Sequence, residues 1–112
     1  MFKKLSLDFE QLRQANQIRQ QEWDPENKIP LMFRTTELGG EVGEALNECK
    51  KLDRERMGLP GSRTTLEKAA SELADVIICV DLVAMDLGVD LGQAVRDKFN
   101  ATSEKVGLKT RM

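Results

Sequence analysis

The chain has 112 residues, of which 40% are hydrophobic and 32% charged, and its formal net charge is −2. This length predicts one domain spanning residues 1–112, and the composition is that of an ordinary globular protein. The near balance of charge argues against a protein whose main task is to hold nucleic acid by broad electrostatic attraction. The absence of histidine excludes histidine bases and histidine-containing metal sites.

Two cysteines, Cys49 and Cys79, lie outside any CxxC motif, and we expect both to be buried free thiols. That pattern suits a reducing compartment. The first residues, Met1 to Lys4, do not begin the apolar run of a signal peptide. No stretch reaches about 18 consecutive apolar residues, which argues against a membrane span. We therefore expect a cytoplasmic protein with neither a membrane nor a nucleic acid as its partner.

Hydrophobic spacing predicts four helices and no strand. Their expected ranges, in chain order, are 7–23, 30–56, 64–87 and 91–105. The expected N-terminal signals are Ser6, Pro30 in the first turn of the second helix, a capping box of Thr64 with Glu67, and Asp90. Gly88 and Gly107 are expected to end the last two helices, and the tail 108–112 is expected to be loose. Short connections between the helices predict an all-α fold, an antiparallel four-helix bundle.

The third helix is apolar on nearly every side from Leu73 to Leu87. A helix of this kind is expected to be buried all round, and three short helices can scarcely cover it. We therefore expect a homo-oligomer, either a homodimer or a homotetramer; the alternative is a central helix well covered within a monomer.

The second helix contains Gly39, Gly40 and Gly43. Each glycine costs about 1 kcal/mol relative to alanine in a helix interior. Three glycines within five residues indicate the close approach of another helix or of a ligand, and a local kink is the alternative.

Acidic residues form two clusters with the same spacing, Glu41-Val42-Gly43-Glu44 and Glu72-Leu73-Ala74-Asp75. Acids three residues apart share one face of a helix. Glu37 and Glu48 extend the first cluster, and the four glutamates from 37 to 48 fall within about 60° of one another. One such stripe is equally typical of a solvated face. A second acid pair at the front of an apolar helix is costly without a cation, and oxygen-only ligands suit Mg²⁺, with Mn²⁺ as an alternative.

These two clusters, at this separation, resemble the ExxE…ExxD signature of the MazG-like, all-α nucleoside triphosphate pyrophosphohydrolases. The surrounding segments 40–46 and 71–78 are similar as well, and the resemblance extends from about Trp23 to Gly107. It implies cleavage of a nucleoside triphosphate between the α and β phosphates, giving the monophosphate and pyrophosphate. It also implies Mg²⁺ as the cofactor, held by four carboxylates: Glu41, Glu44, Glu72 and Asp75.

The resemblance further implies a catalytic set of Glu37, Glu41 and Glu44. Either Glu37 or Glu48 could accept the proton of the attacking water. Many relatives have two consecutive glutamates at the first motif, whereas this chain has Gly40 before Glu41, so the identity of the base stays open.

Substrate contacts are expected from two further places. One face of the fourth helix carries Lys98, Thr102 and Lys105. The family often has lysine, asparagine and a second basic residue there, and Thr102 stands in the place of the asparagine. A solvated surface is the alternative for the lysines. Trp23, the single tryptophan, lies where related deoxycytidine triphosphate enzymes stack a tryptophan on the base. Its alternative role is an anchor in a core or an interface.

The implied biological role is the removal of surplus or non-canonical nucleotides, and the preferred base and sugar stay open. Three alternatives remain. One is another substrate for the same chemistry, such as phosphoribosyl-ATP. The second is a catalytically silent helical oligomer or regulatory nucleotide-binding protein. The third, a di-iron protein, is disfavoured because such sites use Glu-x-x-His.

Overall fold

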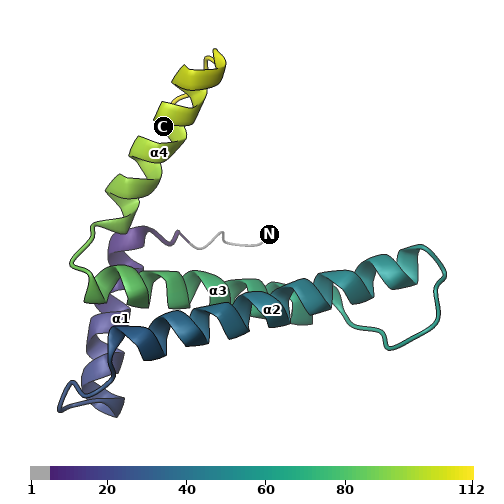
Figure 1. Ribbon diagram of the computed structural model, residues 1–112, viewed down its shortest axis with the longest axis horizontal. Helices are drawn as coiled ribbons and strands as arrows, with labels where there is room; N and C mark the ends of the chain where they lie inside the picture. The colour runs from purple at the N-terminus through teal and green to yellow at the C-terminus, as the bar shows by residue number, and fades with distance from the viewer. Residues whose placement is uncertain (1–5) are drawn as a thin grey trace.

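A computed structural model describes residues 6–112, and these residues form four α-helices and no strand (Figure 1). In chain order the helices are α1 (Phe9–Trp23), α2 (Leu31–Arg56), α3 (Leu66–Asp86) and α4 (Leu91–Val106). The all-α prediction is confirmed over this part of the chain. Met1 to Lys4, which carried the expectation about a signal peptide, lie outside the described residues. None of the helices in residues 6–112 combines the length and the apolar character needed to cross a bilayer.

Three of the four helices in the described residues begin with a side-chain cap. Asp90 caps α4 by accepting a hydrogen bond from the Gln93 amide, as predicted. The other two predicted caps are wrong by one or two residues. Asp8, and not Ser6, caps α1, in a reciprocal capping box with Gln11. Thr65, and not Thr64, caps α3 by accepting from the Lys68 amide. In both cases several polar residues precede the helix, and only the residue directly before its first turn can reach the free amides.

The helix ends agree with the glycine signals. Gly88 and Gly107 have φ values of 68° and 74°, a left-handed conformation that glycine adopts without strain. The tail after Gly107 is not loose, contrary to the prediction. Met112 returns to α4, where its backbone exchanges two hydrogen bonds with the side chain of Asn100, at 2.8 and 3.3 Å.

The packing is dominated by α2 and α3, which run antiparallel side by side; residues 31–86 are called the α2–α3 hairpin below. α1 crosses α3, and α4 packs on α1 near its own start and then projects away from the hairpin (Figure 1). The predicted antiparallel four-helix bundle is therefore not closed by one chain. The radius of gyration is 17.3 Å, against about 13 Å for a compact domain of this length.

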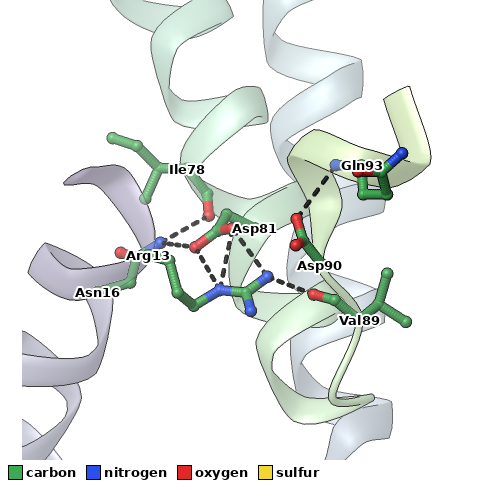
Figure 2. A network of polar contacts seen from close by, with 7 residues as sticks. All are labelled: Arg13, Asn16, Ile78, Asp81, Val89, Asp90 and Gln93. Carbon is green, nitrogen blue, oxygen red and sulfur yellow. Dashed lines mark hydrogen bonds and ion pairs between the residues drawn. The ribbon is translucent and has the colours of Figure 1, made fainter. Parts of the chain in front are cut away.

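A buried ionic network ties three parts of the chain together (Figure 2). Asp81 of α3 is 0% exposed. It accepts hydrogen bonds from the Arg13 Nε, at 3.1 and 3.2 Å, and from the Asn16 amide nitrogen, at 2.9 Å. Arg13 also donates to the backbone carbonyl of Val89, at 2.8 Å. α1 is thereby fixed both to α3 and to the short connection that leads into α4.

A second network lies nearby. The Arg34 side chain of α2 is buried and donates to Asp86 of α3, at 2.6 Å, and to Gln20 of α1, at 2.7 Å. The Arg34 guanidinium group thus joins α1, α2 and α3. A hydrogen bond to a charged group contributes about 1.5–3 kcal/mol, so these two arginines contribute much of what holds α1 in place.

Within one chain the apolar side chains of α3 are not buried all round; the predicted burial depended on a homo-oligomer, which stays a prediction. Leu73 and Ile77 are each 52% exposed. Among the described residues, the buried hydrophobic side chains are three alanines: Ala45, Ala69 and Ala84. Three helices have too little surface to cover α3, as the sequence argument anticipated.

The structure corrects one smaller expectation and narrows another. Cys49 is exposed and Cys79 half-buried, so burial of Cys49 was wrongly predicted, although both are free thiols. α2 continues as α-helix through Gly39, Gly40 and Gly43, and a Cβ added at any of them would meet no described atom within 4 Å. Another helix of the same chain is therefore not the reason for these glycines.

Candidate metal centre

Three carboxylates from the two helices of the hairpin converge midway along it. Glu41 of α2 and Glu72 and Asp75 of α3 each place one carboxylate oxygen within 4.8 Å of the other two. The two motifs meet because the helices run antiparallel, which brings the middle of α2 beside the first half of α3. The spacing of three residues puts Glu72 and Asp75 one turn apart on the same side of α3.

These acids have no compensating cation in the described part of the chain. None of its ion pairs includes Glu41, Glu72 or Asp75. One oxygen of Glu41 and one of Glu72, the Oε2 atom in each case, are buried without a hydrogen-bond partner. A buried carboxylate oxygen in this state is costly, and a cation bound there would relieve the cost.

The electrostatics of the cluster reflect this lack of compensation. Burial raises the pKa of Glu41 above its ordinary value, and the charges of Glu44, Asp75, Glu72 and Glu37 raise it further. Burial is also the first cause of the raised pKa of Glu72, followed by the Glu44 carboxylate beside it and by Asp75. Both acids are thus disfavoured in the ionised form that a metal ion requires as its ligand.

The remaining acids of α2 differ from one another. Glu44 lies beside Glu72 but does not belong to the converging trio. Glu37 is exposed and contributes its charge to Glu41. The structure therefore places all four motif acids in one region, with three of them converging on a common point.

Glu48 is set apart from the other acids of the stripe. It is only 5% exposed and pairs with Lys51, at 3.2 Å, and with Lys68, at 4.0 Å. The pKa of Glu48 is lowered, first by the nearby Thr64 hydroxyl and then by Lys51. The Thr64 hydroxyl itself makes no hydrogen bond of ordinary geometry. A carboxylate held in its ionised form by two lysines is a poor proton acceptor, which argues against Glu48 as the base.

The predicted phosphate-binding residues are not brought to the acids by the same chain. Lys98, Thr102 and Lys105 lie on α4, which extends away from the hairpin (Figure 1). Lys98 and Thr102 line a shallow groove that is otherwise mostly apolar, with Phe99 and Leu108 among its walls. Contact of these residues with phosphate stays a prediction.

Trp23 ends α1 and is 59% exposed, so it is not a core anchor within one chain. The Arg19 guanidinium group lies over its ring, 4.9 Å from the centroid. One face of the ring is thereby occupied. Stacking of a base on Trp23 stays a prediction.

Sequence reasoning missed two further features of α3. The first is the Arg13–Asp81 network, for which the signal was an aspartate within the apolar run of α3, since a charge placed there needs a partner. The second is Cys79, whose pKa is raised by burial and then by the charges of Glu41, Glu37 and Asp75. This thiol lies beside the acid cluster, one turn after Asp75.

Comparisons with protein-family models, with curated proteins and with solved structures found no match. The chemistry of the site has to be judged from its own residues. An all-oxygen donor set of three carboxylates, two of them with an unpartnered buried oxygen, suits a hard divalent cation.

Proposed function

We propose that the chain is a Mg²⁺-dependent nucleoside triphosphate pyrophosphohydrolase, with Mn²⁺ as an alternative metal. It would convert a nucleoside or deoxynucleoside triphosphate to the monophosphate and pyrophosphate, and so remove surplus or non-canonical nucleotides. The observation that carries the proposal is the convergence of Glu41, Glu72 and Asp75 without a cationic partner among the described residues. The ExxE…ExxD resemblance supplies the reaction.

In this proposal Glu41, Glu72 and Asp75 hold the metal. Bound there, Mg²⁺ would polarise phosphate oxygens and position a water for in-line attack. Glu44 and Glu37 are the neighbouring carboxylates that enter no described ion pair. We assign acceptance of the water's proton to one of these two, since Glu48 is held by Lys51 and Lys68.

Self-association is part of the proposal. The accessible surface of the chain is 8806 Å², whereas a compact monomer of this mass exposes about 6200 Å². The excess is larger than the ~800 Å² that each partner buries in a standard interface. In such an assembly, α4 of a second copy could bring its lysines to the acids. The two free thiols suit the reducing cytoplasm where the nucleotide pool is found.

The test is an assay of the purified full chain with Mg²⁺ and a panel of ribonucleoside and deoxynucleoside triphosphates, with phosphoribosyl-ATP included. We expect equal amounts of pyrophosphate and monophosphate, and no product in EDTA. Turnover of phosphoribosyl-ATP alone would reassign the substrate. Release of orthophosphate from the triphosphates, or no turnover of any compound, would contradict the proposed reaction. Binding of nucleotide without turnover would favour the regulatory alternative.

A further inference from the structure

Two ion pairs join α2 to α3 in residues 6–112, and they lie on either side of the converging acids. Arg34 of α2 pairs with Asp86 of α3, at 2.6 Å, where α2 begins and α3 ends. Glu48 of α2 pairs with Lys68 of α3, at 4.0 Å, towards the other end of the hairpin. Because the two helices run antiparallel (Figure 1), the acids occupy the segment between these two pairs.

On α2, the spacing places Glu41 midway between the two ion pairs. Arg34, Glu41 and Glu48 follow one another at intervals of seven residues. Seven residues are close to two turns of α-helix, with a rise of about 10.5 Å and a rotation of only about 20°. The three side chains therefore leave α2 on nearly the same side, and each ion pair lies two turns from Glu41.

The partners on α3 follow the same side of that helix. Lys68 precedes Glu72 by four residues, and Asp86 follows Asp75 by eleven, which correspond to rotations of about 40° and about 20°. Both ion pairs thus connect the sides of the helices on which the acids converge. Because the acids carry like charges, they push the helices apart there, and an attractive pair on each side opposes this separation.

Glu48 is a costly residue in its position. It is 5% exposed, and its Oε2 atom is buried without a hydrogen-bond partner. It is also among the charges that, after burial, Glu44 and Asp75, raise the pKa of Glu72. A carboxylate buried beside other acids adds to their repulsion, and the Glu48 charge is stabilised there by the lysines with which it pairs.

Lys68 is also placed against a local preference. It is the third residue of α3, and the partial positive charge at a helix N-terminus disfavours a lysine. Its side chain is 60% exposed, yet its ammonium group extends to the buried Oε1 atom of Glu48. Lys51 reaches the same oxygen, at 3.2 Å, but Lys51 and Glu48 belong to one helix. Of the two pairs, the one with Lys68 crosses between the helices.

We infer that Glu48 and Lys68 are positioning residues of the candidate metal centre. Their ion pair, together with that of Arg34 at the other end of the hairpin, holds the three acids near one another in the metal-free chain. A site assembled before the metal arrives has less ordering left to undergo on binding, and it therefore binds more tightly. This inference rests on the metal centre of the proposed function but not on the proposed reaction, since no nucleotide enters it.

The test measures the affinity of the full chain for Mn²⁺ alone, from the electron paramagnetic resonance signal of the free ion. Glu48→Gln removes a negative charge near the metal centre, and Lys68→Gln removes a positive one. Direct attraction of the cation would make the two substitutions act in opposite directions, with tighter binding in Lys68→Gln. Positioning predicts weaker binding in both, by about two- to fivefold for an ion pair with one exposed partner. Far-UV circular dichroism verifies the fold of each variant.

Lys51→Gln is the matched control, because it removes the same charge from the same carboxylate oxygen without breaking an ion pair between the helices. It should bind Mn²⁺ at least as tightly as wild type. Binding by Lys68→Gln that equals or exceeds that of wild type would overturn the inference, and so would equal weakening in Lys51→Gln and Lys68→Gln. A wild-type chain that does not bind Mn²⁺ would contradict the metal centre and the proposed function with it. Mn²⁺ binding without turnover of any nucleotide would contradict the reaction alone.

Hydrogen exchange gives a second measurement that does not depend on a metal affinity. In EDTA, the amides of residues 69–76 should exchange faster in Lys68→Gln than in wild type, because the repelling acids are less firmly held. The difference should shrink at saturating Mn²⁺, since the metal then holds the same acids. Equal exchange of the two proteins in EDTA would show that the ion pair does not position the acids.

Discussion

The two halves of α3 treat their carboxylates in opposite ways. In the C-terminal half, Asp81 and Asp86 are neutralised by Arg13 and Arg34, at 3.1 and 2.6 Å. In the N-terminal half, Glu72 and Asp75 face further acids of α2 and enter no described ion pair. The chain thus supplies arginines where a carboxylate holds the fold together, and none where the carboxylates converge.

The difference separates a structural site from a candidate ligand site. Removing a partner from the neutralised half leaves a buried charge unpaired. Removing an acid from the converging half relieves repulsion, but it also takes away a proposed ligand. Substitutions in the neutralised half should therefore lower stability. Substitutions in the converging half should lower activity and raise the stability of the metal-free protein.

The largest effect is expected for activity in the converging half. Asp75→Asn or Glu41→Gln should lower kcat/KM for the best triphosphate by about 10³-fold or more, because each removes a charged ligand from a small donor set. Glu67→Gln, on the first turn of α3 and outside the trio, is the control and should retain activity. Full activity in Asp75→Asn would sink the metal-ligand assignment.

A large effect on stability is expected in the neutralised half. Arg13→Ala should lower the free energy of unfolding by about 3–5 kcal/mol, since Asp81 is 0% exposed and would lose its cation. Urea titration followed by circular dichroism measures the loss. Lys28→Ala breaks an exposed ion pair with Glu26 and should cost less than about 1 kcal/mol. Equal losses in the two variants would show that the buried network does not fix α1.

A smaller effect of opposite sign is expected for Glu72→Gln. Without metal, this variant should melt at a higher temperature than wild type, because an uncompensated carboxylate is removed from the cluster. With Mg²⁺, wild type should gain thermal stability and the variant should gain less. Differential scanning calorimetry with and without EDTA measures both. A lower melting temperature for the variant than for wild type in EDTA would mean that another group already neutralises the carboxylate cluster.

The smallest effect concerns pH. The pKa values of Glu41 and Glu72 are raised from 4.5 in the fold, so the folded state binds more protons than the unfolded state just above pH 4.5. The resulting destabilisation is absent below that pH and grows as pH rises through the raised values. In metal-free protein, the difference in stability between Glu72→Gln and wild type should therefore increase upward from about pH 4.5. A difference that is constant from pH 4 to 7 would contradict the raised pKa of Glu72.

Much of the fold could be predicted from the sequence, because helix signals are local. The four helices, the cap at Asp90 and the stop glycines 88 and 107 follow from spacing and backbone preference alone. The errors at Ser6 and Thr64 arose where neighbouring residues had similar capping chemistry. The return of the tail to Asn100 depends on a contact across 12 residues, which no local pattern encodes.

The candidate site was predictable only in part. The spacing of Glu41, Glu44, Glu72 and Asp75 indicated an acid cluster, because residues one turn apart share a helix face whatever the packing. That Glu48 also pairs with Lys68 of α3, and that α4 extends away from the hairpin, depends on how the helices pack.

The sequence by itself determined the helices, the acid pairs and the shortage of surface to cover α3, since each depends on residue type and spacing along one helix. The tertiary structure decided which acids converge and which carboxylates receive an arginine. These features depend on the rotation of α2 and α3 about their axes, and that rotation is fixed only when Ala45 and Ala69 are buried between them.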